Sequence, residues 1–309
     1  MSRLTIMRRL IGLVGPLWAV MAFAILAGIA GHLAAIAVPT VGLAAALSAA
    51  GFDFMPAYGT LFAALAVCAV ARGVMHYLEQ TANHYIAFKL LARIRHLVFA
   101  ALRRLAPAKL AGRGRGDLIS VITGDIELLE VFYAHTISPV AIAFGVSAVV
   151  VAVEFALHPV FAALTATAFV TVGVVVPVIA NAASGTSGKR FRDELGALDT
   201  YLLDSLRGLS EAMQYGVART RGEEFFHRSA ALAEREAELK DRAGANQAAM
   251  SVVVWVFDLG IAIAGLHLFY FGHITLAHML LGTVLLMSSF GPVVALASLG
   301  TGLQQTFAA

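Results

Sequence analysis

The stretch from Ala134 to Ala183 decides the fold class, and it reads AHTISPVAIAFGVSAVVVAVEFALHPVFAALTATAFVTVGVVVPVIANAA. Apart from Glu154, it contains no Asp, Glu, Lys or Arg. A helix of about 20 apolar residues is long enough to cross the roughly 30 Å hydrocarbon core of a bilayer. His158 and Pro159 divide the stretch near its middle. It therefore predicts two transmembrane helices joined by a hairpin turn.

Four more apolar stretches lie outward from this pair. The six predicted spans cover residues 17–47, 58–80, 134–156, 160–183, 249–271 and 274–300. The composition agrees, because the 309-residue chain is 60% hydrophobic and only 13% charged, whereas a soluble domain has about 25% charged residues. The single cysteine, Cys68, permits no intramolecular disulfide. We therefore expect an all-α membrane protein with six transmembrane helices, and we exclude a soluble enzyme and a disulfide-stapled secreted domain.

The basic residues predict the orientation. All 22 Lys and Arg lie in residues 3–9, at Arg72, in 89–115 or in 189–242, and none lies near the turns at 49–57, 157–159 and 272–273. Because basic residues favour the cytoplasmic side, we expect both termini to be cytoplasmic in a multi-pass plasma (cell inner) membrane protein. Residues 1–15 predict an interfacial elbow helix, or alternatively a charged flank of the first span. The topology explains the net charge of +3, so we expect no nucleic acid partner.

Two long connections between the spans predict intracellular helical hairpins, at about 86–132 and 186–245. In the first, apolar residues between Ile86 and Leu105 recur every three or four positions among basic ones, which is typical of an amphipathic helix. In the second, residues 191–213 and 223–242 show a similar pattern, with a turn expected near Tyr215 and Gly216. Such helices could pass motion to a cytoplasmic partner, or they could simply be solvated faces of a bundle.

Charged side chains inside the spans are candidates for function, because each is costly in lipid unless it faces a cavity or a partner. Arg72, His76 and Glu79 lie on roughly one face of the second span. They could bind a zwitterionic solute, with Arg72 taking a carboxylate and Glu79 an ammonium group, or they could be a structural cluster. Asp258 in the fifth span is expected in the same cavity or as the buried partner of Arg72. Glu154 lies close to a turn, and we expect it to reach the membrane interface.

Local sequence narrows the class of protein. The runs that do so are Gly116-Asp117-Leu118-Ile119-Ser120, Gly124-Asp125-Ile126-Glu127-Leu128-Leu129-Glu130 and Phe132-Tyr133-Ala134-His135-Thr136-Ile137-Ser138-Pro139. They resemble the transmembrane domain of an ABC exporter with the type-1 exporter fold. The resemblance implies six helices after an elbow helix, and two hairpins whose coupling helices contact nucleotide-binding domains. It also implies pairing with a second transmembrane subunit in a homo- or heterodimer.

A second motif narrows the resemblance to one branch of that family. The segments His76-Tyr77-Leu78-Glu79-Gln80, His84 and Phe88-Lys89-Leu90-Leu91-Ala92-Arg93-Ile94-Arg95 are similar to the C subunit of the cysteine/glutathione exporter of cytochrome bd assembly and to related amino-acid ABC permease/ATP-binding proteins. This similarity implies haem b at His84, although His76 and Gln80 stand where the subunit has basic residues. The alternative is that His84 makes an ordinary polar contact.

The resemblance also places the coupling residues and the ATPase. It implies that the two hairpin tips carry them, at Arg113, Asp117 and Asp125 in the first and at Leu198, Asp199 and Tyr201 in the second. No G-x-x-x-x-G-K-[S/T] motif is present in residues 16–309, since the best match has Ala183 and Arg190 at two required positions. We therefore expect ATP and Mg²⁺ to bind a nucleotide-binding domain that another chain supplies or that is missing here. We expect no catalytic site and no metal site in this chain.

These expectations combine into one function with two alternatives. The chain would be the membrane-spanning permease part of an ATP-driven exporter, which moves a small thiol, amino acid or peptide-like solute by alternating access. One alternative is a haem-binding or assembly membrane subunit. The other is a proton-coupled secondary transporter that uses Arg72, Glu79 and Asp258, although such a fold predicts inverted repeats, and the sequence has no convincing one.

Overall fold

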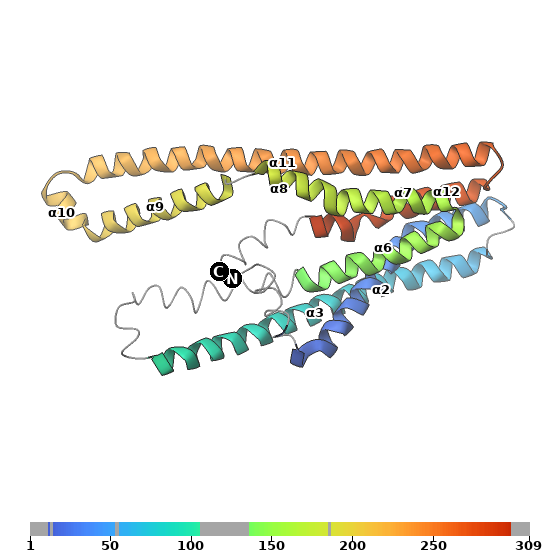
Figure 1. Ribbon diagram of the computed structural model, residues 1–309, viewed down its shortest axis with the longest axis horizontal. Helices are drawn as coiled ribbons and strands as arrows, with labels where there is room; N and C mark the ends of the chain where they lie inside the picture. Colours follow the sequence, from blue (N-terminus) through green and yellow to red (C-terminus); the bar gives the residue numbers. More distant parts are fainter. Residues whose placement is uncertain (1–11, 13–14, 53–55, 106–135, 185–186, 298–309) are drawn as a thin grey trace. The chain divides into compact units, whose positions relative to one another are not determined.

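The computed structural model describes residues 12, 15–52, 56–105, 136–184 and 187–297, apart from the side chains of 181–187 and 189. Helices make up almost all of this described part, which contains no strand (Figure 1). The elements are η1 (Gly15–Leu17), α2 (Trp18–Ala49), α3 (Tyr58–Leu105), α6 (Ser138–Leu157), α7 (Pro159–Val170), η4 (Thr171–Val175), α8 (Val176–Ser184), α9 (Ser187–Arg207), α10 (Leu209–Gln214), α11 (Ala218–Tyr270) and α12 (Leu276–Ser289).

Six helices of the described part are long and apolar enough to cross a membrane: Gly15–Ala49, Tyr58–Leu105, Ser138–Leu157, Pro159–Ala180, Ala218–Tyr270 and Leu276–Ala297. This confirms the predicted all-α fold with six spans. Two of the six, α3 with 48 residues and α11 with 53, are far longer than a bilayer requires. At 1.5 Å per residue each extends for about 70–80 Å. Both therefore continue well beyond any membrane that they cross.

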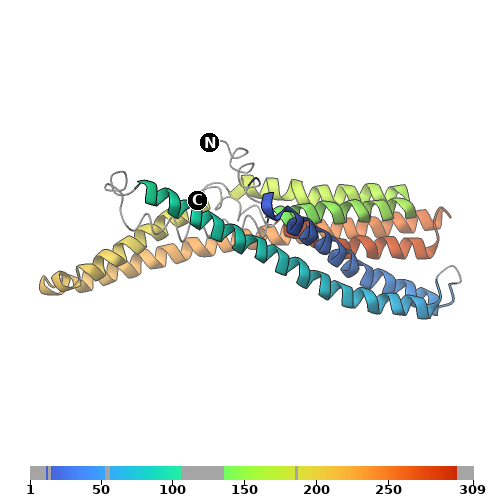
Figure 2. The same ribbon diagram turned by 90° about the horizontal axis from the view of Figure 1, so that it is seen from below.

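The chain forms two compact units, and the first combines Met1–Val175 with Val254–Ala309. Within this unit α2 packs along α3 and also contacts α6 and α12, while α6 packs against α7 (Figures 1 and 2). One cluster of buried residues, which we call the α3 core, joins α2 to the second half of α3. Its members are Met21, Ile86, Ala87, Leu90, Leu91 and Ile94.

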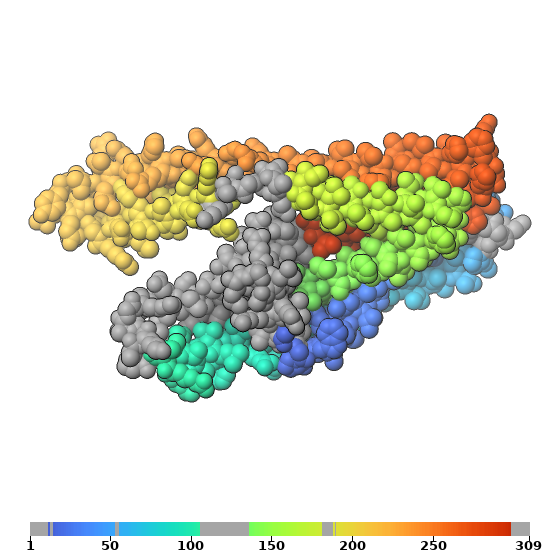
Figure 3. Space-filling view, in the orientation of Figure 1, coloured from blue at the N-terminus to red at the C-terminus, as the bar shows by residue number. Residues whose placement is uncertain are grey.

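The second unit, Val176–Val253, contains a helical hairpin. We call α9, α10 and residues 218–253 of α11 the α9–α11 hairpin. The chain reverses direction at Tyr215 and Gly216, where the turn was expected, and Gly216 has a φ of +70°. Glycine adopts this left-handed conformation without the steric cost that a Cβ would add. Figure 3 shows the side chains of α9 and α10 packed along α11.

Several predicted regions lie outside the described residues. These are the elbow helix over residues 1–15, except for residues 12 and 15, and the part of the first hairpin beyond Leu105. Residues 298–309 are outside them as well. The interfacial helix and the tip of the first hairpin therefore stay predictions.

Candidate functional site

A cavity of about 210 Å³ lies between α2 and α3, and ionisable side chains form part of its lining. It is open to the surface, since the His76 side chain on its rim is 63% exposed. Its lining residues are Gly31, His32, Ala35, Arg72, Gly73, His76 and Glu79. The structure thus brings together three of the four predicted cavity residues, but Asp258 is not among the lining residues.

The sequence of the two helices explains this arrangement. Arg72, His76 and Glu79 are spaced by four and then three residues, which places their side chains on one face of α3. Gly31 lets α2 approach that face, because a Cβ there would lie 3.2 Å from the Cβ of Met75. Gly28 makes room in the same way, because a Cβ there would overlap Ile142 and lie 3.1 Å from the Cδ of Glu79. Small residues on α2 therefore position the carboxyl group.

Glu79 is the most buried polar side chain of the cavity, at 5% exposed. Its Oε2 lies 3.4 Å from Nδ1 of His76, and its Oε1 accepts a hydrogen bond of 3.4 Å from Nδ2 of Asn83. The carboxyl group is thus held between two neighbours on its own helix. With Arg72 two turns away, the cavity brings a guanidinium group and a carboxyl group to one face of α3.

His32 is a cavity residue that the sequence analysis missed. It is half-buried and comes from α2, opposite the three α3 residues. It is also the only ionisable side chain in α2. The rule that singled out Arg72, which is that an ionisable group inside a span needs a partner or a cavity, could therefore have found His32 as well.

Two buried carboxyl groups are not among the residues that line the cavity. Asp258 on α11 is 9% exposed, and its Oδ1 has no hydrogen-bond partner among the described residues. Its predicted role in the cavity stays a prediction. The expectation that Glu154 reaches the interface is wrong, because its side chain is 0% exposed. The expectation was based on the position of Glu154 near a turn. Residues of α7 and α12 cover this end of α6 and bury the side chain.

His84, the predicted haem ligand, is half-buried on α3, and its ring stacks on Phe88 with 5.9 Å between centroids. It does not line the cavity that contains Arg72 and His76. No group of three or more His, Cys, Asp and Glu that could hold a metal ion stands together in the described part of the chain. The haem assignment stays a prediction that the cavity does not support.

The predicted coupling residues are divided between described and undescribed parts of the chain. Arg113, Asp117 and Asp125 lie outside the described residues. Leu198, Asp199 and Tyr201 lie on α9, before the turn of the hairpin rather than at it. Their coupling role stays a prediction.

Tyr201 is tied into the hairpin by three contacts. Its hydroxyl donates a hydrogen bond of 3.2 Å to the Arg221 carbonyl oxygen. The guanidinium groups of Arg221 and Arg228 lie 4.9 Å and 4.4 Å from the centre of its ring. Arg228 also pairs with the exposed Glu224 at 2.6 Å, and this hydrogen bond holds the pKa of the Glu224 carboxyl below its usual value. Tyr201 therefore joins α9 to α11.

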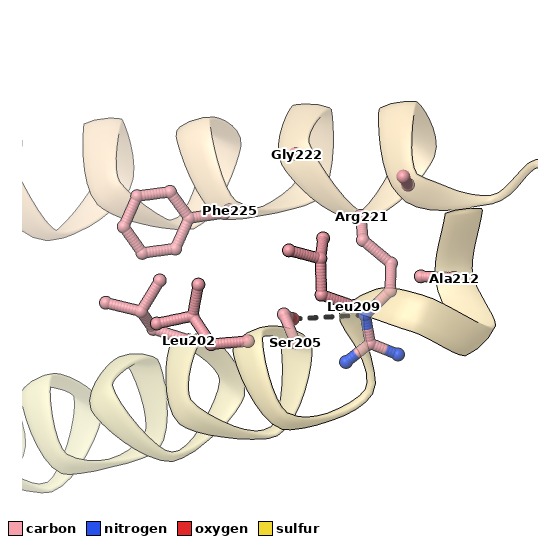
Figure 4. Close-up of a pocket in the computed structure, with 9 residues that line it drawn as sticks. Leu202, Ser205, Leu209, Ala212, Arg221, Gly222 and Phe225 are labelled. Atoms are coloured by element: carbon pink, nitrogen blue, oxygen red, sulfur yellow. Dashed lines mark hydrogen bonds between the residues drawn. The ribbon is translucent and has the colours of Figure 1, made fainter.

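A groove of about 180 Å³ lies next to this contact within the hairpin. Figure 4 shows Leu202, Leu209 and Phe225 around it, with Ser205 linked to Arg221. The Arg221 Nε donates a hydrogen bond of 3.0 Å to the Ser205 Oγ. The groove is therefore largely apolar and has one polar edge.

The short helix α10 lies at the end of the hairpin and exposes a group of apolar side chains. The exposed members of this group, which we call the α10 tip, are Leu209, Met213, Tyr215 and Val217. The sequence analysis placed coupling residues earlier in the chain and missed this helix. Gly208 and Gly216, which bracket it, are the signal that could have indicated a separate short element.

The described residues do not fit an ATP phosphate-binding loop. Ala183 lies within α8 and Arg190 within α9, where the motif requires an open glycine-rich loop that leads into a helix bearing Ser or Thr. The match at 183–190 is therefore not a nucleotide site.

Comparisons with known proteins agree with this architecture. Residues 18–293 match the family model of the ABC transporter transmembrane region. A probable ABC transporter ATP-binding/permease protein of Haemophilus influenzae is 42% identical over 303 residues, which are 98% of this chain and 55% of the relative. This chain thus spans about half the length of that relative.

Two further relatives match shorter regions. The glutathione/L-cysteine transport system ATP-binding/permease protein CydC of Escherichia coli is 34% identical over 100 residues, which are 32% of this chain and 17% of that protein. The corresponding protein CydD of Bacillus subtilis is 29% identical over 151 residues, which are 48% of this chain and 26% of that protein. The predicted likeness to this group of transporters is confirmed.

Proposed function

The chain belongs to the family of ABC transporter transmembrane regions, and on this premise we propose that it is the membrane-spanning permease part of an ATP-driven exporter. The observation that carries the proposal is the pair of spans that continue as long helices, of which α11 leads directly to the α10 tip. Helices of this length can carry movement between a cytoplasmic ATPase and a membrane cavity. Alternating access by such rigid elements would then open the cavity to one side at a time.

We place the contact with a nucleotide-binding domain at the α10 tip. Met213 is 67% exposed and Tyr215 is 77% exposed, although both side chains are largely apolar. An apolar group on an otherwise charged hairpin favours burial against a partner. ATP and Mg²⁺ would bind that partner domain, which the relatives carry in the same polypeptide according to their names. The complete transporter would contain two transmembrane regions, as a homodimer or a heterodimer.

The ATPase test compares two exposed positions of the α9–α11 hairpin. We expect Met213→Glu to reduce ATP hydrolysis by the intact protein, or by its complex with the ATPase chain, because a charge would be buried at the contact. Glu234→Gln, on the α11 side of the hairpin, is the control, and it should leave the rate unchanged. Wild-type protein without ATPase activity in native lipid would contradict the proposed function. Equal activity of the two variants would contradict only the location of the contact.

The cavity between α2 and α3 is the proposed solute site. Arg72 would bind a carboxylate and Glu79 an ammonium group, while His32 and His76 complete the polar lining. These groups suit a small amino acid or thiol solute, and the names of the CydC and CydD relatives specify glutathione and L-cysteine. A haem-binding subunit and a proton-coupled carrier are less well supported, because His84 lies outside the cavity and the family is that of ATP-driven transporters.

Binding measurements can separate the two halves of this site. We expect Arg72→Gln to weaken binding of L-cysteine and glutathione about tenfold or more, because a hydrogen bond to a charged group contributes about 1.5–3 kcal/mol. Glu79→Gln should weaken L-cysteine binding but spare an analogue without the amino group. Lys89→Gln is the matched control, since Lys89 is exposed on the same helix outside the cavity. Equal effects of all three changes would contradict the site.

We place the protein in the plasma (cell inner) membrane with both termini cytoplasmic. The distribution of Lys and Arg supports this orientation. In the same arrangement the α6–α7 turn and the α11–α12 turn face outward, and the α9–α11 hairpin lies in the cytoplasm. Labelling of single cysteines at His158 and Glu234 with a reagent that does not cross membranes tests it, because only the first should react in intact cells.

A further inference from the structure

Glu154 is a buried carboxyl group that the proposed transport cycle does not yet use. It lies one turn before the end of α6, and its side chain is 0% exposed. Neither carboxyl oxygen has a hydrogen-bond partner among the described residues. The buried hydroxyl of Thr165 on α7 is unpartnered in the same way. Buried polar groups nearly always have partners, so these two groups, on helices that pack together, require an explanation.

Close packing of α7 and α12 keeps water from Glu154. A Cβ at Gly282 on α12 would lie 2.7 Å from the ring of Phe161 and 3.2 Å from Oε2 of Glu154. The same ring faces α11, because a Cβ at Gly265 would lie 3.2 Å from it. Phe161 itself is 0% exposed. The carboxyl group can therefore meet water only when the α6–α7 pair separates from α12.

Among the residues that the structure describes, no neighbouring ionisable group forms a hydrogen bond with the Glu154 carboxyl group. α7 carries no ionisable side chain. On the other surrounding elements, with α11 counted only from Val254 onward, the ionisable side chains are His32 on α2, His158 at the α6–α7 turn, Asp258, His267 and Tyr270 on α11, His273 before α12, and His278 on α12. None of them hydrogen-bonds to the carboxyl oxygens in the described structure. The Nδ1 of His158 instead accepts a hydrogen bond from the Val160 amide, and the Nδ1 of His278 lies 2.8 Å from the Thr275 hydroxyl.

We propose that Glu154 is a proton-binding site at this end of the bundle, protonated while α6, α7 and α12 are packed together and releasing its proton to external water when they separate. A carboxylate without a partner is much more costly to bury than a neutral carboxyl group, so the packed form holds the proton. Hydration removes this cost, so the separated form releases it. The proposal rests on the alternating access proposed above, which supplies the separated state and its outward orientation.

The sign of the pH effect follows from proton linkage. The packed form binds one proton more than the separated form, so a rise in external pH favours separation and a fall favours packing. External acid would therefore hold this end of the transporter closed, whatever solute it carries.

Alkylation of a single cysteine at Met279, beside Gly265, tests this proposal. The intact protein, with Cys68→Ser and Met279→Cys, is placed in nanodiscs without nucleotide and treated with a membrane-impermeant maleimide. The alkylation rate at residue 279 is divided by the alkylation rate of a matched protein with Phe271→Cys, where the residue is exposed. This ratio corrects for the effect of pH on thiol ionisation. We expect this ratio to rise between about pH 6 and about pH 9, because buried glutamates can hold their protons into this range.

Three variants decide the outcome. In Glu154→Gln the ratio of alkylation rates should no longer rise with pH, whereas in Glu154→Asp it should still rise. Asp258→Asn, at the other buried carboxyl group, should leave the rise unchanged. An equal rise in Glu154→Gln would overturn the proposal. If Glu154→Gln does not fold, infrared spectra of the wild type and of Glu154→Asp are compared instead. The proposal would be overturned if no band of a protonated carboxyl group shifts between the two proteins. The alkylation measurement uses no ATP, so its result can be interpreted even if the ATPase test fails.

Discussion

The α3 core and the α9–α11 hairpin both involve helices that are longer than a membrane span. Different interactions hold the helices together in the two regions. The α3 core packs the apolar side chains of Ile86, Leu90 and Leu91 against α2, with each side chain no more than 3% exposed. The α9–α11 hairpin buries little and is joined by polar contacts around Tyr201 and by an ion pair of 2.9 Å between Arg235 and Glu194. Two similar sequence patterns thus produce one pair of helices joined by a buried apolar core and one pair joined mainly by polar contacts.

The largest expected effect is in the α3 core. Leu90→Ala removes a side chain that is 1% exposed and should lower the free energy of unfolding by about 2–5 kcal/mol, because it leaves a cavity between α2 and α3. Denaturant unfolding of the intact protein in detergent measures it. Leu97→Ala, on the exposed side of the same helix at 51%, should change stability by less than about 0.5 kcal/mol. Equal losses would mean that the core does not hold these helices together.

The next effect concerns the turn of the α9–α11 hairpin. Gly216→Ala should destabilise the hairpin by about 1–2 kcal/mol, because its φ of +70° is unfavourable for a residue with a Cβ. Gly222→Ala is the matched control, and it should change the stability of the hairpin in the opposite direction. It lies within α11 with open space around it, so a stabilisation of about 0.5–1 kcal/mol is expected. Hydrogen exchange of the α9 amides measures both changes in stability. If both substitutions stabilised the hairpin, or both destabilised it, the result would contradict the turn geometry.

A smaller effect is expected at Tyr201. Tyr201→Phe keeps the ring between the two guanidinium groups but removes the hydroxyl that bonds to the Arg221 carbonyl. The loss should be about 0.5–1.5 kcal/mol, seen as faster hydrogen exchange in α9 and the start of α11. Tyr215→Phe is the control, because Tyr215 is 77% exposed. Exchange that is unaffected at both positions would show that the hydroxyl does not join the helices.

The smallest effect is expected at the interhelical ion pair. Arg235→Ala should destabilise the hairpin by about 0.2–1 kcal/mol, since Arg235 and Glu194 are about half exposed and water screens their attraction. The difference from the wild type should shrink as salt is added. Lys240→Ala, whose ion pair with Glu236 lies within α11 alone, controls for the loss of a basic residue. A salt-independent loss would indicate packing by the arginine stem instead.

Sequence reasoning succeeded where a pattern has one physical solution. Apolar runs such as 134–156 and 160–183 must become spans, and the spacing of Arg72, His76 and Glu79 must place them on one helix face. It failed where the outcome depends on a neighbour distant in sequence. Glu154 was expected at the interface because it lies near a turn, but residues of α7 and α12 bury it. His32 could have been singled out as an ionisable residue inside a span, but its position in the cavity depends on the packing of α2 on α3.

By itself, therefore, the sequence determined the fold class, the six spans and the side of α3 that carries the ionisable groups. These properties follow from composition and from the helical period, which act along a single segment. The tertiary structure alone decided that Gly28 makes room for Glu79, that Tyr201 joins α9 to α11, and that Glu154 is buried. Each of these depends on which helices meet and at what level, and the free energy of that packing comes from contacts between segments that are far apart in the chain.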